Sequence, residues 1–321
     1  MAYLNVSSVH SDGLLIAIGG GLAWTSPAVG AAPVGNANKI AFVRVVGQDG
    51  HIFVMNGDGT KPTDVSKSEG GDPAWSPDGT RIAFVSNRAN GTNSQVYVMN
   101  TGGSHQTWLT HDSMPDRHPS WSPNGTKIVF AGDGGLFLVT LKTKAVRQLT
   151  QGPDSAPAWS PDGTRIAFER DRSVPNPTNT TGTDTEQDLW MMAADGSQAR
   201  QLTSPPSFSV GTTTFAGEDN FPAWSPDGSK IAFESNRGSN NGIFVMSTDG
   251  TNIVALTHPQ GTDEFPAWAP DGVRIAFDRA VEPVLSSKGQ IYVMNADGSN
   301  QAALTNSSAG ADSPACQPKR A

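Results

Sequence analysis

Aspartate recurs at one fixed distance before a repeated proline, and this pattern is the first sign of chemistry in the sequence. Four repeats carry the aspartate three residues ahead of the proline, at Asp116, Asp154, Asp219 and Asp263. Carboxylates that converge repel each other and raise each other's pKa unless cations or hydrogen-bond donors neutralise them. Because their hard oxygen atoms suit Ca²⁺, the spacing predicts a calcium site. The alternative is that each aspartate hydrogen-bonds the backbone of its own turn.

Histidines, an arginine and further acids stand in the same short segments as these aspartates. The candidate binding residues are His111, Arg117, His118, His258, Glu264 and Asp312. Such a mixture can hold an anionic sugar or a peptide through charge-assisted hydrogen bonds. The alternative is an ordinary solvated loop for each of these residues.

Familiar catalytic patterns are missing from the sequence. It contains neither Gly-x-Ser-x-Gly nor His-Glu-x-x-His. The single cysteine, Cys316, stands where other repeats carry tryptophan, which indicates a small buried side chain rather than a nucleophile. A binding role is therefore favoured over catalysis. A hydrolase or lyase that acts on sugars, with its site at the same place, stays open as the alternative.

A four-part repeat must position these residues. Its first part, Pro-x-Trp-Ser-Pro-Asp/Asn-Gly, is intact at residues 73–79, 119–125, 157–163 and 222–228 and has Ala269 for serine at 266–272. A basic residue and an aliphatic pair ending in Phe follow, then a short apolar run, then Leu-Thr. Asp-Gly and Asn-Gly favour tight hairpins because both residues tolerate positive φ. Four short strands in about 40–50 residues are the signature of a β-propeller blade.

The two ends of the repeat region complement each other. Residues 39–66 contain the motifs of the second, third and fourth strands of a blade but not of the first. Ser313–Pro318 resembles a degenerate first-strand motif that no second-strand motif follows. Together they make one blade, so we expect an all-β, six-bladed propeller with four antiparallel strands per blade. The C-terminal strand then closes the ring and leaves no open sheet edge.

The net charge of −8 gathers in the segments that connect successive blades. These segments hold ten Asp or Glu and two Lys or Arg, which accounts for the whole net charge. In a propeller they cross one face and end at the rim of the central channel. An acidic face attracts cations or a basic partner and disfavours nucleic acid as a ligand.

Residues 1–35 differ from the propeller that we expect over residues 36–321. Leu14–Ala23 is an apolar stretch followed by small residues, as in a secretory signal peptide, although residues 1–13 lack Lys and Arg. The alternative is a disordered leader. Ten apolar residues are too few to span a bilayer, for which about twenty are needed. The leader therefore predicts a periplasmic or secreted protein without a membrane span.

At these repeats the sequence resembles the TolB-like six-bladed β-propellers, over residues 39–318. Full-length TolB also carries an N-terminal α/β domain, for which residues 1–38 are too short. The resemblance specifies the fold rather than the function. Together with the acidic channel face, it leads us to expect a non-enzymatic, monomeric module that binds a protein or peptide at that face, whose charge favours a basic partner and Ca²⁺. A structural subunit of a cell-envelope assembly is a further alternative.

Overall fold

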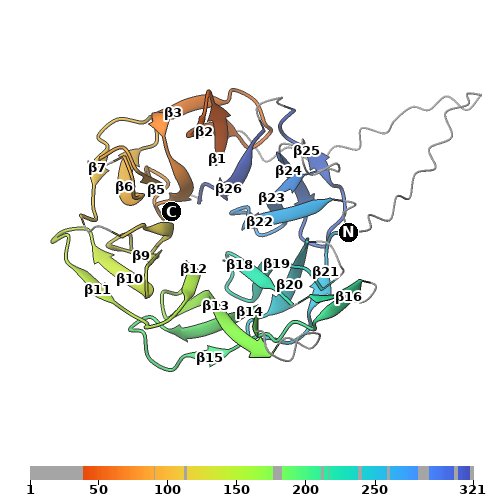
Figure 1. Ribbon diagram of the computed structural model, residues 1–321. Coiled ribbons are helices and arrows are strands. Elements are labelled where there is room, and N and C mark those ends of the chain that lie inside the picture. The colour runs from red at the N-terminus through yellow and green to blue at the C-terminus, as the bar shows by residue number, and fades with distance from the viewer. Residues whose placement is uncertain are drawn as a thin grey trace, which may run out of the picture.

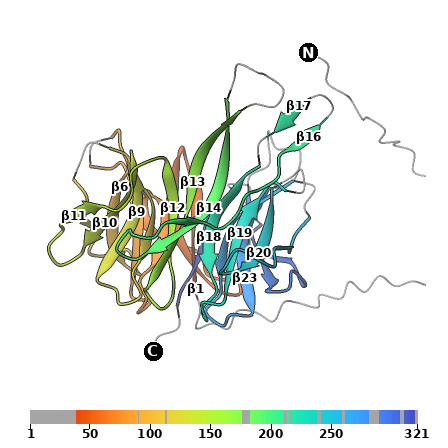
Figure 2. The same ribbon diagram turned by 90° about the horizontal axis from the view of Figure 1, so that it is seen from below.

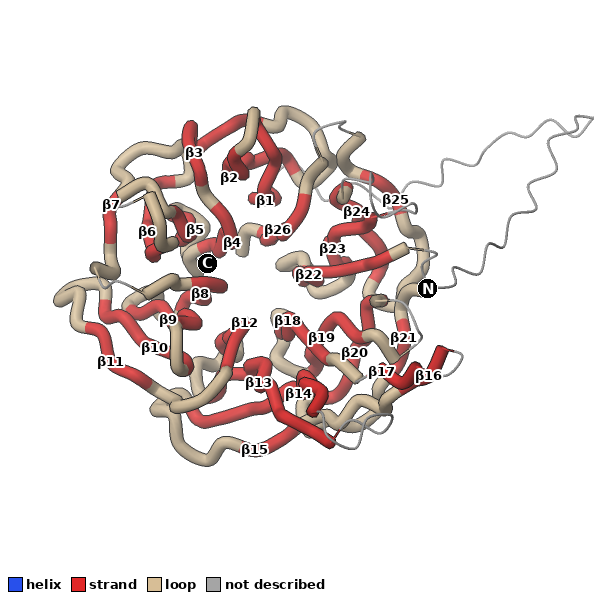
Figure 3. Tube along the Cα trace, in the orientation of Figure 1, coloured by secondary structure: helices blue, strands red, loops and turns tan. Residues whose placement is uncertain are grey.

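Six four-stranded antiparallel sheets surround a central channel in the computed structural model (Figure 1). The structure describes residues 39–89, 91–111, 114–175, 183–210, 213–215, 217–237, 241–258, 261–280, 289–306 and 310–318. The leader, with its expected signal peptide, lies outside these residues. Within them every regular element is a strand, and none is a helix that could span a membrane (Figure 3). The predicted fold is confirmed.

The first three blades, with strands given from the channel outward, have these bounds. Blade one contains β26 (Asp312–Cys316), β1 (Lys39–Val46), β2 (Asp49–Asn56) and β3 (Thr63–Glu69). Blade two contains β4 (Gly71–Trp75), β5 (Arg81–Ser86), β6 (Gln95–Asn100) and β7 (Thr107–Trp108). Blade three contains β8 (Arg117–Trp121), β9 (Lys127–Gly132), β10 (Gly135–Thr140) and β11 (Val146–Gln148).

The other three blades follow the same order, and one short hairpin is added to them. Blade four contains β12 (Asp154–Trp159), β13 (Arg165–Pro175), β14 (Thr183–Ala193) and β15 (Arg200–Gln201). Blade five contains β18 (Asp219–Trp224), β19 (Lys230–Ser235), β20 (Gly242–Ser247) and β21 (Val254–Ala255). Blade six contains β22 (Thr262–Trp268), β23 (Arg274–Ala280), β24 (Gln290–Asn295) and β25 (Ala302–Ala303). The added hairpin contains β16 (Phe208–Val210) and β17 (Thr213–Phe215).

Apolar side chains between neighbouring blades form the core. The repeated phenylalanine of each second strand is at most 1% exposed: Phe42, Phe84, Phe130, Phe168, Phe233 and Phe277. Clusters join adjacent sheets, as where Val54 of blade one packs with Trp75 and Phe84 of blade two. The repeated tryptophan reaches the preceding blade, as where Trp121 Nε1 of blade three donates a hydrogen bond to the Ala74 carbonyl of blade two at 3.1 Å. The tryptophans thus hold blades together rather than forming a ligand platform.

Cys316 takes the place of this tryptophan in blade one. Its Sγ lies 3.7 Å from the Ala267 carbonyl of blade six, the counterpart of the carbonyl that Trp121 contacts. Burial raises the pKa of the Cys316 thiol to about 12, so the thiolate that a nucleophile needs is disfavoured.

The Leu-Thr motif completes each blade through its hydroxyl group. In five blades the threonine Oγ1 accepts a hydrogen bond, at 2.9 or 3.0 Å, from the backbone N–H fourteen residues earlier on the third strand. Ser66 Oγ does the same for Ile52 in blade one. A hydroxyl at this position therefore satisfies a buried donor that the outermost strand does not reach.

Replacing this hydroxyl should destabilise the propeller. In Thr257→Val the Ile243 N–H loses its partner while the shape of the side chain is kept, so we expect a loss of about 1–3 kcal/mol in the free energy of unfolding. Urea titration measures it. Thr257→Ser is the control, because blade one uses serine at this place and should tolerate it. Equal loss in both variants would contradict the role of the hydroxyl.

The C-terminal strand closes the ring as the sequence predicts. β26 pairs with β1, with Ile40 opposite Cys316 and Ala41 opposite Ala315. Gln317 then anchors the end, since its Nε2 donates to the Gly79 carbonyl of blade two at 2.7 Å. β13, β14 and the β16–β17 hairpin project from one face of the ring (Figure 2).

Candidate site at the channel mouth

The residue just before the repeated proline of each innermost strand has an unusual backbone. All six of these residues have φ between 44° and 53° although none is glycine: Asp72, His118, Ala156, Phe221, Phe265 and Ser313. In blade four the strand register shifts between Ser155 and Ala158, so Ala156 and Pro157 form a bulge, and blades two, three, five and six shift at the same place. Bulges re-aim side chains. We call these six residues the mouth ring.

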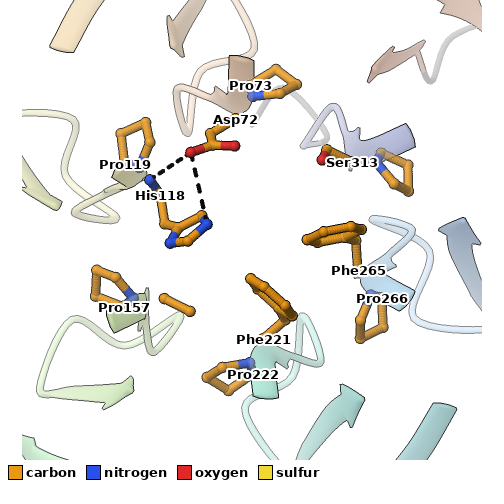
Figure 4. Close-up of a pocket in the computed structure, with 12 residues that line it drawn as sticks. Asp72, Pro73, His118, Pro119, Pro157, Phe221, Pro222, Phe265, Pro266 and Ser313 are labelled. Carbon is orange, nitrogen blue, oxygen red and sulfur yellow. Dashed lines mark hydrogen bonds and ion pairs between the residues drawn. The ribbon is translucent and has the colours of Figure 1, made fainter. Parts of the chain in front are cut away.

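The mouth ring and its prolines line a cavity of about 150 Å³ at the end of the channel (Figure 4). This end of the channel lies on the face from which β13 and β14 project. The antiparallel pairing of β12 and β13 shows this, because Asp154 at the start of β12 lies opposite Arg170, close to the projecting part of β13. A left-handed backbone at a non-glycine residue costs on the order of 1–3 kcal/mol and clusters at functional sites. Six such residues around one cavity mark it as the candidate site.

One half of the mouth ring is polar and the other apolar. The His118 N–H donates to Asp72 Oδ2 at 2.9 Å, and its Nδ1 lies 3.2 Å from Ser155 Oγ. The edge of the His118 ring meets Phe221 at 5.3 Å between ring centroids, and Phe221 meets Phe265 at 4.5 Å. Contacts thus run around the ring from Asp72 to Phe265, which holds these side chains toward the cavity (Figure 4).

Acids of the second strands support the apolar half. Glu169 and Glu234 directly follow the repeated phenylalanine of blades four and five, and the backbone N–H groups of Phe221 and Phe265 hydrogen-bond to their carboxylates. Each acid therefore holds the mouth-ring residue of the next blade. Asp278 has the same position in blade six.

Burial shifts the ionisation of these acids. Desolvation, followed by the charges of Asp171 and Glu218, raises the pKa of Glu169 to about 8. Desolvation, followed by Asp312 and Glu264, raises the pKa of Asp278 to about 8. The pKa of Glu234 is raised for the same reasons. None of these three acids was predicted as a site residue, although the sequence places an acid directly after the repeated Phe in three successive repeats.

Arginines hold three of the four aspartates for which calcium was predicted. Asp154 forms two hydrogen bonds with Arg170, Asp219 with Arg237 and Asp263 with Arg279, each within one blade. These three carboxylates are fully buried. The fourth, Asp116, accepts a hydrogen bond from the Thr110 hydroxyl. The described residues contain no group of three His, Cys, Asp or Glu that could hold a metal ion. Calcium binding stays a prediction.

The predicted binding residues divide between the channel and the outer loops. His118 belongs to the mouth ring, and Arg117, Glu264 and Asp312 directly precede ring residues on β8, β22 and β26. His111 instead packs against Trp108 of the outer strand β7, with 4.2 Å between ring centroids. His258 is exposed beyond β21. The structure therefore brings four of these six residues to the channel mouth.

Comparisons with known proteins agree with this architecture. The sequence model described as the TolB beta propeller domain matches residues 24–135 and 209–320, more than half of the chain. No curated protein matches significantly. TolB from Acinetobacter baumannii is similar in structure, with a TM-score of 0.70, 22% identity, and coverage of 88% of this chain and 67% of that chain.

Two further solved structures are similar in fold. A putative TolB from Agrobacterium tumefaciens has a TM-score of 0.60 and 20% identity, and the match covers 84% of this chain and 88% of that one. An oligogalacturonate lyase in complex with manganese has a TM-score of 0.50 and 16% identity, with 83% and 72% covered. Similarity at this level concerns the fold, whereas the family model matches the repeats themselves. This chain belongs to the TolB β-propeller domain family.

Proposed function

We propose that this chain is a protein- or peptide-binding module that takes up its ligand at the mouth ring. The observation that carries the proposal is the set of six left-handed, pre-proline residues around one cavity. A cavity of about 150 Å³ accommodates one or two side chains rather than a whole sugar chain. A peptide segment that inserts a side chain fits it best. The signal-like leader supports a site of action outside the cytoplasm.

The chemistry of the mouth ring also favours binding over catalysis. Phe221 and Phe265 supply the rigid apolar surface that dominates binding energy, and the polar half supplies orientation. A lyase whose metal ion is held by two or more histidines in the channel would be the alternative. Among the residues that line the cavity, histidine occurs once, as His118.

Selection of peptides from a random display library tests the proposal. Twelve-residue peptides are selected on the intact protein, and their affinities are compared on the double variant Phe221→Ala/Phe265→Ala. Blade four carries alanine natively at this position, so the variant should fold. We expect at least a tenfold loss of affinity, since buried aromatic anchors contribute about 2 kcal/mol or more.

The matched control for this selection is Val273→Ala. Val273 is 58% exposed in the turn between β22 and β23, at the opposite end of β22 from the mouth ring. It should leave the affinities unchanged. Peptides that bind the double variant as tightly as the parent protein would refute binding at the mouth ring.

A further inference from the structure

Six carboxyl groups lie near the apolar half of the mouth ring, and among the described residues their charged neighbours are acids. They come from blades four, five and six and the closing strand, and we call them the acidic arc: Glu169, Glu218, Glu234, Glu264, Asp278 and Asp312. Each interacts electrostatically with another acid. Three arginines of these blades, Arg170, Arg237 and Arg279, are paired with Asp154, Asp219 and Asp263.

Some hydrogen-bond donors are also missing at this place, although Glu234 accepts from Asn241 and from the Phe265 N–H. Oε2 of Glu234, Oδ1 of Asp278 and Oδ1 of Asn220 have no partner among the described residues. Glu234 is 3% exposed, and Asp278 and Asn220 are 7% exposed. A buried acceptor without a donor costs about 1–3 kcal/mol, more if it is charged. Asn220 Oδ1 is an acceptor, and the carboxyl oxygens of Glu234 and Asp278 are acceptors once these groups ionise. A cation with several N–H groups would therefore complete this layer.

An aromatic surface lies beside the acids. Phe221 directly follows Asn220, Phe265 directly follows Glu264, and both rings line the cavity. Glu264 and Asp312 are partly exposed and directly precede the ring residues Phe265 and Ser313, while Glu234 and Asp278 are buried more deeply. A cation over an aromatic face is stabilised by the ring quadrupole. Aromatic rings beside carboxylates suit an organic cation better than Ca²⁺, which takes six to eight oxygen ligands.

The chain itself shows how such a pocket holds an arginine. The Arg279 guanidinium lies 5.1 Å from the Phe277 ring centroid and 4.8 Å from that of Tyr292, and both its Nε and Nη2 donate to Asp263. Arg170 repeats this arrangement with Phe168, Trp190 and Asp154. A guanidinium is planar, weakly hydrated and able to donate twice to one carboxylate, whereas an ammonium is a strongly hydrated point charge.

We propose that the mouth ring accepts the guanidinium of an arginine in the bound peptide, between the Phe221–Phe265 pair and the acidic arc. This assignment rests on the proposed peptide-binding function and adds the chemical class of the anchoring side chain. It also gives the acidic arc, which the fold does not neutralise, a partner of opposite charge.

Proton release should accompany this binding. The polar neighbours of Glu234 are Asn241, Glu169, Glu218 and Glu264. Those of Asp278 are Asp263, Asp312 and Glu264. Every one of these neighbours that can carry a charge is an acid. Their raised pKa values keep some of these groups protonated at neutral pH in the free protein. A guanidinium favours the ionised form, so binding expels protons, and affinity rises as the pH increases from 6 to 9.

Calorimetry with short capped peptides tests the proposal. The probes are Ac-Gly-Arg-Gly-NH₂ and its citrulline and lysine counterparts, titrated at pH 8 and again at pH 6. Arginine should bind at least tenfold more tightly than citrulline, its neutral isostere, and more tightly than lysine. At pH 7, buffers of different ionisation enthalpy should reveal proton release for arginine and none for citrulline.

The variant Glu234→Gln supplies the matched comparison. Glutamine mimics the protonated acid, so the variant should melt like the parent, bind citrulline as before and lose most of the preference for arginine. Asp49 is an exposed acid at the start of β2, and Asp49→Asn should change neither the binding of citrulline nor the preference for arginine. Equal affinity for arginine and citrulline, or for arginine and lysine, would overturn the guanidinium assignment. If the library peptides still bind the mouth ring, that result leaves the proposed function intact, whereas a failure of both experiments removes both.

Discussion

Deletion of residues 310–321 should cost more than about 5 kcal/mol of folding free energy, a third or more of the roughly 5–15 kcal/mol by which folded proteins are stable. The deletion removes β26, and with it the strand pairing to β1 and the carbonyl of Ala315 to which Trp75 Nε1 donates at 3.0 Å. It also exposes Ile40 and Phe42, which are at most 1% exposed in the closed ring. An open edge on blade one would remain, with its backbone groups unpaired.

Differential scanning calorimetry measures this effect. We expect the truncated protein to aggregate, or to melt far below the full-length protein in a broad transition. Deletion of residues 319–321 alone is the control and should leave the transition unchanged. A cooperative transition of the longer truncation at the full-length temperature would show that β26 does not close the ring.

Asp263→Asn should destabilise the protein by about 3–5 kcal/mol, because it leaves the Arg279 guanidinium largely buried without its carboxylate. The Asp263 side chain is fully buried and that of Arg279 is 18% exposed, so water replaces little of the lost interaction. The double variant Asp263→Asn/Arg279→Met removes the orphaned charge and should recover part of the stability. Urea unfolding in the presence of EDTA measures all three proteins. Asp249→Asn, in an exposed turn, serves as the control for loss of one surface charge.

The same experiment separates the ion pair from the calcium site that the aspartate spacing predicts. Calcium added to the metal-stripped parent should leave its melting temperature unchanged if Asp263 serves Arg279 alone. If Asp263→Asn instead unfolded like the parent in EDTA and lost only a calcium-dependent stabilisation, Asp263 would be a metal ligand and the ion-pair account would be wrong.

The repeat made the fold predictable, because each of its residues has a local structural reason. Proline begins a strand, and Asp-Gly forms the turn that follows it. Phenylalanine fills the space between sheets, and the threonine hydroxyl accepts a hydrogen bond from a buried N–H. The complementary ends predicted the ring closure for the same reason.

The site was predicted only in part. Counting charges pointed to the segments that contain Glu264 and Asp312, and both of these residues directly precede a mouth-ring residue. The ion-pair partner of Asp263 could not be predicted from the charge count, because Arg279 lies opposite Asp263 only through the antiparallel register of β22 and β23. The mouth ring was missed because phenylalanine and histidine before proline give no sign of a left-handed backbone. The spacing of residues along the chain indicates which of them lie near the channel, whereas the strand register decides which side chains form ion pairs.

Photo-crosslinking from the mouth ring tests the central claim most directly. A selected peptide is irradiated with protein that carries p-benzoylphenylalanine in place of Phe265, and separately in place of Val273 at the opposite end of β22. If the channel mouth is the binding site, the adduct forms from position 265 and is suppressed by an excess of unlabelled peptide, while position 273 gives none. An adduct from position 273 alone would place the ligand on the other face and contradict the account.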